Sequence, residues 1–356
     1  MSNDCMVREV KTSVNQDNRM DIHIALLREV HDTAEGVMVT PNSTMEREIL
    51  EGLLQTPKRI ASKYFYDARG SELFEAICEL PEYYPTRTES AILAKYAHEM
   101  AERIGPNAIV IEFGSGSSTK TRILLDALIS PKAYIPVDIS EALLLSASAQ
   151  LRTDYPNLIV EPVHADYTST FRLPEIAQNA GRVIAFFPGS TIGNFEPQEA
   201  AKFLERIAHL VGEQGALLIG VDLRKSIAIL EPAYNDSQGI TAQFNLNVIT
   251  RLHRELGIDL SETDFGHYAF FNSAESRIEM HLIAKRDFCA TIAGQHIEFR
   301  NDEHVITEYS YKYSLEAFNA LALDAGFAQA EVWKDEENLF SVQLLDVAQL
   351  TNSRLN

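Results

Sequence analysis

Short apolar runs alternate with amphipathic segments along the middle of the chain, from about residue 107 to residue 222. The apolar runs are AIVIEFG, AYIPVDI, LIVEPVHAD, VIAFFPGS and ALLIGVDL, and helical patterns such as TKTRILLDAL, EALLLSASAQLRTDY and PQEAAKFLERIAHLV lie between them. Nearly continuous apolar runs are typical of strands that are covered on both faces. Strands that alternate with helices predict a parallel sheet with right-handed crossovers. The pattern therefore predicts an α/β, doubly wound core.

The alternation ends after Asp222. A helical stretch follows, RIEMHLIAKR and CATIAGQHIEF then predict antiparallel strands, SLEAFNALALDAGF predicts a helix, and QAEVWKD and LFSVQLLDV predict a closing strand pair. We interpret the chain as a sheet core interrupted by an inserted α+β substrate-binding domain, preceded by helices and a polar, flexible tail. The expected division is 1–20 for the tail, 21–87 and 225–313 for the substrate domain, and 88–224 and 314–356 for the core.

Composition narrows the possible partners. The formal net charge is −20, so the chain has no electrostatic attraction to nucleic acid or to an anionic membrane surface. The three cysteines, Cys5, Cys78 and Cys289, form no C-x-x-C pair, which argues against a disulfide framework and a zinc site. No apolar run is long enough to span a membrane, and the N-terminus lacks the apolar segment of a signal peptide. We expect a cytoplasmic, metal-free monomer that binds a small molecule.

A glycine-containing loop, IEFGSGSST (residues 111–119), follows the first predicted strand and precedes a helix. Gly114 and Gly116 allow the backbone to turn tightly and to approach a ligand closely. Thr119 replaces the third glycine of the dinucleotide fingerprint, so the loop alone is only a weak indication of a nucleoside site. Glu112, just before the loop, disfavours a pyrophosphate and suits a cationic ligand.

Carboxylates also follow the next two predicted strands. Asp138 ends the second strand, where it can accept hydrogen bonds from both ribose hydroxyls, and Asp166 with Tyr167 ends the third, where a carboxylate and a ring suit an adenine. Because the carboxyl ends of parallel strands share one sheet edge, these groups should meet beside the glycine loop. The combination favours a Rossmann-like S-adenosylmethionine methyltransferase core, with a dehydrogenase as the alternative.

Five segments, taken in order, resemble one known family. They are SKYFYDARGSELFEAICELPEYYPTRTE, IEFGSGSSTKTR, PGSTIGNF, RIEMHL and TEYSYKY. They are similar to the histidine-specific N-alpha-methyltransferases of ergothioneine biosynthesis, and the resemblance covers roughly residues 50 to 345. It implies that the protein converts L-histidine to hercynine (N-alpha-trimethylhistidine) in three methyl transfers, each of which releases S-adenosylhomocysteine.

The resemblance also implies a set of site residues. It places the cofactor, S-adenosylmethionine, against Gly114, Ser115, Gly116, Lys120, Asp138, Asp166 and Tyr167. It places the amino acid against Tyr66, Tyr83, Asn194, Tyr234, Met280, Glu308 and Ser310, with Tyr66 and Asn194 in the catalytic positions.

The residue types suit that chemistry. Glu308 and Ser310 are two residues apart, so in a strand both point to one face, where a carboxylate and a hydroxyl can hold the two imidazole nitrogens. Asn194 follows the fourth predicted strand and therefore lies at the same sheet edge as the cofactor. Two rival interpretations stay open: a methyltransferase acting on another aromatic amino acid such as tryptophan, and a non-catalytic adenosylmethionine-binding protein. A carboxylate opposite an indole ring argues against the first, and the complete set of tyrosines argues against the second.

Overall fold

The computed structural model describes residues 43–116, 119–169, 171–178 and 181–348. The expected tail and most of the first helical stretch, up to residue 42, lie outside the described residues. One of the helices expected before the core is α2 (Thr44–Leu53), which is capped by Ser43, whose side chain accepts a hydrogen bond from the backbone N–H of Glu46.

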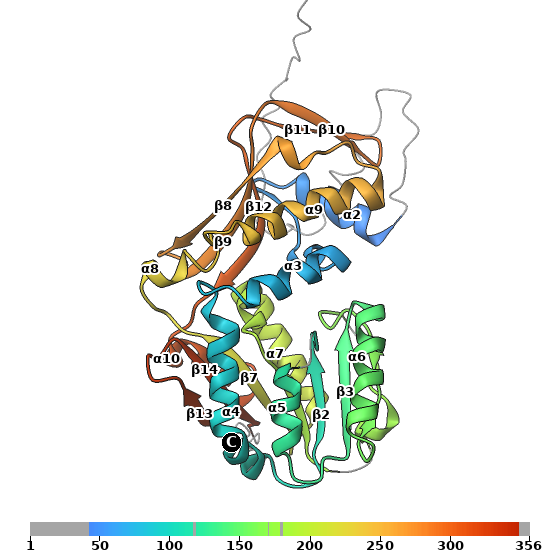
Figure 1. The fold of residues 1–356 in the computed structure, drawn as a ribbon, viewed down its shortest axis with the longest axis vertical. Coiled ribbons are helices and arrows are strands. Elements are labelled where there is room, and N and C mark those ends of the chain that lie inside the picture. The colour runs from blue at the N-terminus through green and yellow to red at the C-terminus, as the bar shows by residue number, and fades with distance from the viewer. Residues whose placement is uncertain (1–42, 117–118, 170, 179–180, 349–356) are drawn as a thin grey trace, which may run out of the picture. The chain divides into compact units, whose positions relative to one another are not determined.

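A central sheet joins the predicted core strands (Figure 1). Its strands are β2 (Ile109–Phe113), β3 (Ala133–Asp138), β4 (Ile159–Val160), β5 (Val163–His164), β6 (Val183–Phe187), β7 (Ala216–Asp222), β13 (Phe327–Lys334) and β14 (Phe340–Val347). The order is β13-β14-β7-β6-β2-β3-β4, with β5 also paired to β3. Strands β2 to β7 are parallel, and β14 lies antiparallel between β7 and β13. The α/β doubly wound prediction is confirmed.

Helices cover both faces of this sheet, which explains its nearly continuous apolar strands. One face packs against α4 (Tyr84–Ile104), α5 (Thr119–Ala127) and α6 (Glu141–Asp154), and the other against α7 (Pro197–Val211) and α10 (Leu315–Asp324). Alternate residues of β2 serve the two sides, since Ile109 and Ile111 belong to one apolar cluster and Val110 to the other.

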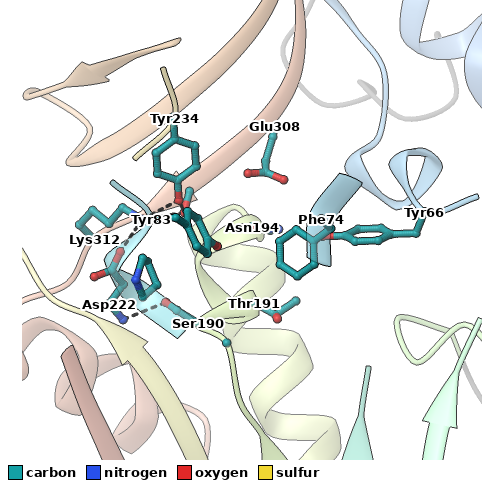
Figure 2. A pocket seen from close by; sticks show the side chains of 13 residues that line it. Tyr66, Phe74, Tyr83, Ser190, Thr191, Asn194, Asp222, Tyr234, Glu308 and Lys312 are labelled. Carbon is teal, nitrogen blue, oxygen red and sulfur yellow. Dashed lines mark hydrogen bonds and ion pairs between the residues drawn. The ribbon is translucent and has the colours of Figure 1, made fainter. Parts of the chain in front are cut away.

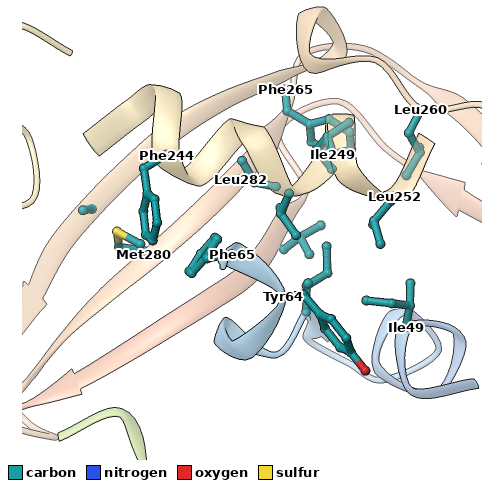
Figure 3. Close-up of a cluster of buried hydrophobic side chains, with 14 of the residues drawn as sticks. Ile49, Tyr64, Phe65, Phe244, Ile249, Leu252, Leu260, Phe265, Met280 and Leu282 are labelled. Atoms are coloured by element: carbon teal, nitrogen blue, oxygen red, sulfur yellow. The ribbon is translucent and has the colours of Figure 1, made fainter. Parts of the chain in front are cut away.

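A second sheet has its own apolar core. Its order is β1 (Lys58–Arg59), β12 (His304–Tyr311), β9 (Arg277–Ala284) and β8 (Phe265–Asn272), and the hairpin β10–β11 (Phe288–Ile292, Gln295–Phe299) lies next to it in the chain. The long helix α9 (Ile240–Leu256) packs on it together with α2, a short 3-10 turn (Ser62–Phe65) and α3 (Ala68–Cys78) (Figure 3). Segments from before and after the core strands therefore share one apolar cluster.

Two details differ from the sequence expectations. LIVEPVHAD forms two short strands, β4 and β5, rather than one, because Pro162 between them has no N–H to donate to a strand ladder. The expected division between residues 87 and 88 falls inside α4, which begins at Tyr84 and whose apolar side belongs to the core of the central sheet.

Candidate active site

The glycine loop lies where the strand order of the central sheet changes direction. From β2, the chain continues to β3 on one side, while β6 and β7 lie on the other. Ligands of such sheets bind outside the carboxyl ends of the strands at this point. Gly114 and Gly116 have φ angles of 71° and 42°, which L side chains rarely adopt. A side-chain carbon built on Gly114 would meet no atom closer than 3.9 Å, so the loop presents bare backbone to open space.

A large cavity opens over this edge, and every cofactor residue expected from the resemblance lines it. They are Gly114, Ser115, Gly116, Lys120, Asp138, Asp166 and Tyr167. Asp138 accepts a hydrogen bond from the backbone N–H of Ser140 (2.8 Å). Burial raises the pKa of the Asp138 carboxyl above its usual value. Ligand hydroxyls that donate hydrogen bonds to the carboxylate would stabilise its charged form.

Asp166 and Tyr167 line the same cavity, with the Tyr167 ring next to Gly114. The Asp166 carboxylate accepts a hydrogen bond from the Thr168 backbone N–H (2.8 Å) and forms an ion pair with Lys63 (3.4 Å), a residue of the substrate domain. The Tyr167 ring contacts Phe113 edge-on, at 6.0 Å between centroids, and has one side in the cavity. Bare loop backbone, two carboxylates and an aromatic ring at the cavity wall fit the nucleoside and amino-acid ends of S-adenosylmethionine.

Glu112 has a different environment from the one that the sequence suggested. Its carboxylate accepts hydrogen bonds from the hydroxyls of Thr121 and Tyr134, both at 2.7 Å. Burial raises its pKa to about 7. Glu112 therefore joins β2 to β3 and α5 as well as lining the cavity.

A smaller pocket adjoins the cavity (Figure 2). Its walls come from both domains: Tyr66, Phe74, Tyr83, Pro85, Gly189, Ser190, Thr191, Asn194, Asp222, Tyr234, Glu308, Ser310 and Lys312. Several of these residues, including Tyr66, Tyr83 and Asn194, also line the large cavity. The two spaces therefore meet at the residues expected in the catalytic positions.

The loop after β6 brings Asn194 to this junction. Gly193 packs so closely on β12 that a side-chain carbon there would lie 2.8 Å from the carbonyl oxygen of Tyr311. Ser190, in the left-handed conformation at φ 57°, accepts a hydrogen bond from the backbone N–H of Asp222 (2.8 Å). Contacts on both sides thus hold the short turn Thr191–Asn194 between the two sheets.

Strand β12 presents alternate residues to the pocket, as the two-residue spacing predicted. Glu308 and Ser310 lie on its wall, and Lys312, just beyond the strand, continues the series. Within the described part of the chain, the Glu308 carboxylate has no hydrogen-bond or ion-pair partner, and it points into the pocket (Figure 2). Burial raises the pKa of Glu308 to about 7.

Tyrosines form the rest of the wall. The rings of Tyr66 and Tyr83 each contact Phe74 edge-on, at 5.7 and 6.3 Å between centroids, and Tyr83 contacts Tyr234 in the same way at 6.4 Å. Burial raises the pKa values of Tyr66 and Tyr83 well above the usual value. Both phenols therefore stay protonated near neutral pH and act as hydrogen-bonding groups, not as bases.

Met280 differs from its expected place. It pairs with Glu308 across the β9–β12 ladder, but it is 2% exposed and belongs to the apolar cluster beneath α9, beside Phe244 (Figure 3). It is absent from the described lining of the pocket and of the cavity. As direct cross-strand partners, Met280 and Glu308 project from the same face of the sheet, and Met280 packs beside Glu308 into the apolar cluster, where a flexible thioether fills irregular space.

Sequence reasoning missed a buried charged network under the pocket. Asp222, at the carboxyl end of β7, forms ion pairs with Lys312 (2.7 Å) and Lys225 (2.5 Å). The same carboxylate accepts hydrogen bonds from the Tyr84 hydroxyl at 2.7 and 2.9 Å. The only signal in the sequence is that Asp222 ends a strand at the ligand-binding edge and that Lys312 follows Ser310 by two residues.

A second missed residue is Glu89 on α4, whose side chain is fully buried. Its carboxylate accepts hydrogen bonds from the backbone N–H of Gly189 (2.8 and 3.0 Å) and from Lys120 (2.5 Å). Glu89 therefore ties the loop that carries Asn194 to a residue that lines the cofactor cavity. Gly220 makes room for it, because a side-chain carbon at that position would lie 2.0 Å from Glu89 Oε1.

Among the residues that the structure describes, no group of three or more His, Cys, Asp or Glu side chains is arranged to hold a metal ion. None of their helices has the length and apolar character needed to cross a membrane. The expected monomeric state and cytoplasmic location remain predictions.

A largely parallel sheet with a glycine loop, carboxylates at successive strand ends and an adjoining pocket is the architecture of a Rossmann-like, S-adenosylmethionine-dependent methyltransferase. The model of one family, described as histidine-specific methyltransferase, SAM-dependent, matches residues 45–347, and the chain belongs to this family.

Curated relatives agree with this assignment. Histidine N-alpha-methyltransferase from Mycolicibacterium smegmatis is 39% identical over 84% of this chain and 94% of its own length. Ergothioneine biosynthesis protein 1 from Neurospora crassa is 33% identical over 78% of this chain and 32% of its own length. A more distant relative, 4-dimethylallyltryptophan N-methyltransferase easF from Claviceps purpurea, is 29% identical over 82% of this chain and 92% of its own.

Proposed function

We propose that the protein methylates the α-amino group of L-histidine three times and produces hercynine, the first step of ergothioneine biosynthesis. The proposal rests on the family, on relatives named for histidine methylation, and on one feature of the pocket. That feature is the Glu308 carboxylate, which points into the pocket and has no partner in the described part of the chain. The side chain is half-buried, and its oxygens are available to accept a hydrogen bond from a ligand that supplies a donor.

The pocket can orient the substrate between its two walls. Glu308 and Ser310 on β12 offer an acceptor and a hydroxyl to the imidazole ring. Tyr83 and the Asn194 amide, on the side shared with the cofactor cavity, can donate to the carboxylate. This arrangement leaves the α-amine at the junction of the two spaces, beside Tyr66 and Asn194.

The amine must present a lone pair about 3 Å from the methyl carbon in an in-line displacement. The cofactor, when bound, supplies a methyl group on a sulfonium, whose positive charge also disfavours a protonated amine beside it. Tyr66 and Asn194 orient the amine by hydrogen bonds, and its proton passes to water, because the Tyr66 phenol is held in its neutral form by burial. Because water accepts the proton, repeated methyl transfer requires no separate catalytic base in the protein.

The alternative substrate is another aromatic amino acid, since one relative is named for a tryptophan derivative. The Glu308 carboxylate opposes it, because an indole ring offers a single N–H and would cover the carboxylate with carbon. Mass spectrometry of histidine after incubation with enzyme and S-adenosylmethionine tests the proposal. Three added methyl groups on the α-nitrogen support it, whereas ring methylation, or faster turnover of tryptophan, refutes it.

A further inference from the structure

Lys312 lies beneath the proposed imidazole subsite and contacts both hydroxyls there. Its ammonium lies 2.8 Å from Ser310 Oγ and 3.0 Å from the Tyr234 hydroxyl oxygen, and those two oxygens are 2.9 Å apart. Asp222 completes its surroundings at 2.7 Å. Lys312 is 2% exposed, so water does not compete for these contacts. Lys312, Ser310 and Tyr234 form a closed triangle in the wall of the pocket, where Figure 2 labels Lys312 and Tyr234.

The charge state of Lys312 fixes the direction of two of these hydrogen bonds. Burial alone would lower its pKa, but Asp222 and the Tyr234 hydroxyl raise the pKa above the usual value. An ammonium has three protons and no lone pair, so it donates to all three of its neighbours. Each hydroxyl oxygen therefore accepts one hydrogen bond from Lys312.

The third side of the triangle is the hydrogen bond between the Tyr234 and Ser310 hydroxyls, and one of these two groups must supply its proton. Either Tyr234 donates to Ser310 or the reverse, and the phenol is the more acidic hydroxyl, so it is the better donor. Ser310 Oγ then accepts from both Lys312 and Tyr234, and a serine hydroxyl has only two lone pairs. The Ser310 proton is left to point away from the triangle, toward the pocket.

We propose that Lys312 is a positioning residue that makes Ser310 a hydrogen-bond donor, so that the pocket selects the neutral imidazole ring of histidine over imidazolium. This inference rests on the proposed function. A neutral imidazole has one N–H and one lone pair, which match the Glu308 carboxylate and the Ser310 hydroxyl. Imidazolium has two N–H groups, and one of them would face the Ser310 proton.

The experiment compares histidine with 3-(1,2,4-triazol-3-yl)alanine, whose ring keeps an N–H and a lone pair but stays neutral across the range assayed. The measured quantity is the ratio of kcat/KM for histidine to that for the analogue. Titration of the shared α-amine and of the protein groups around the ring affects both substrates and largely cancels in the ratio. Those groups are Glu308, Lys312, Asp222, Lys225, Tyr66, Tyr83, Tyr84 and Tyr234.

With a ring pKa of about 6.5, the neutral fraction of histidine falls about tenfold between about pH 7.5 and about pH 5.5. We expect the ratio to fall by about the same factor. A ratio that stays level or rises, in an enzyme that methylates histidine, overturns the selection of the neutral ring and leaves the proposed function intact. Failure to methylate histidine at any pH refutes the proposed function instead.

Lys312→Met tests the positioning role, because it frees a lone pair on Ser310 and lets that oxygen accept from imidazolium. The fall in the ratio should shrink to about threefold or less. Lys225→Met is the matched control, since Lys225 shares Asp222 but contacts neither Ser310 nor Tyr234. It should keep the full pH dependence.

Tyr234→Phe frees the other lone pair on Ser310 and keeps the Asp222–Lys312 pair, so it provides the test if Lys312→Met does not fold. It should flatten the ratio in the same way. Binding of S-adenosylhomocysteine confirms the fold of each variant. If every folded variant of Lys312 or Tyr234 keeps the wild-type pH dependence, the positioning role is wrong.

Discussion

The Glu308 carboxylate permits the sharpest test of how the pocket recognises its substrate. It points into the pocket without a partner in the described part of the chain, so a bound ring N–H would be its first donor. A hydrogen bond to a charged group contributes about 1.5–3 kcal/mol. Glu308→Ala should therefore raise the Kd for histidine about 10- to 150-fold. Glu308→Gln keeps an acceptor oxygen but loses the charge, and it should cost less, about fivefold.

The same residue should destabilise the free protein at high pH. Burial raises the pKa of Glu308 from 4.5 to about 7. Between these values the folded protein keeps a proton that the unfolded chain has lost, so stability falls as pH rises through the window. At one pH unit per 1.36 kcal/mol, the cost above pH 7 is at most about 3 kcal/mol. Glu308→Gln should therefore be more stable than the wild type at about pH 8, with the difference shrinking toward about pH 5.

Calorimetric titration with histidine, in the presence of saturating S-adenosylhomocysteine, measures the first effect, and urea denaturation at both pH values measures the second. The two effects must oppose each other: the variant binds histidine more weakly and unfolds at higher urea. An unchanged histidine affinity in Glu308→Ala would refute ring recognition. Equal losses of histidine and S-adenosylhomocysteine affinity would show that Glu308 only supports the fold.

Three further substitutions test the rest of the site. Asn194→Ala should abolish methylation while S-adenosylhomocysteine still binds, and a wild-type rate would remove Asn194 from the site. Glu89→Gln should weaken binding of both ligands, each by about tenfold in calorimetric titration, because Glu89 holds Lys120 and the Gly189 backbone; a loss confined to one ligand would contradict this. Gly220→Ala should destabilise the protein by about 1–3 kcal/mol in urea denaturation, because its new carbon would overlap Glu89, and an unchanged midpoint would contradict that packing.

Local patterns in the sequence were sufficient to predict the core. Continuous apolar runs identified the parallel strands, and because such strands end at one edge, the sequence alone placed Gly114, Asp138 and Asp166 together. The two-residue period of β12 likewise placed Glu308 and Ser310 on one face. Each of these inferences depends only on neighbours in the chain and on the geometry of a regular element.

Glu89, Asp222 and Lys312 were missed because the partners that allow these charged side chains to be buried are remote in the chain. A lone charged residue in a sequence is usually solvated. Their partners are remote: Glu89 accepts from Gly189, and Asp222 pairs with Lys312 of the second sheet. Met280 shows the converse error, because a family position next to Glu308 on the same sheet face does not determine whether a side chain reaches the pocket or the apolar cluster beside it.

The Asp222–Lys312 pair explains how substrate and cofactor residues can share one geometry although they belong to different sheets. Asp222 ends β7 of the central sheet, and Lys312 follows β12 of the second sheet, where an isolated bridge between Leu223 and Tyr313 also joins the two. Both side chains are only 1% exposed, so the cost of removing them from water offsets most of their attraction. The pair therefore contributes little net stability. Separating the two side chains, however, would leave each charge buried without its partner. Any shift of β12 relative to β7 would therefore cost free energy. The pair thus holds the wall that carries Glu308 and Ser310 against the sheet edge that carries the cofactor residues.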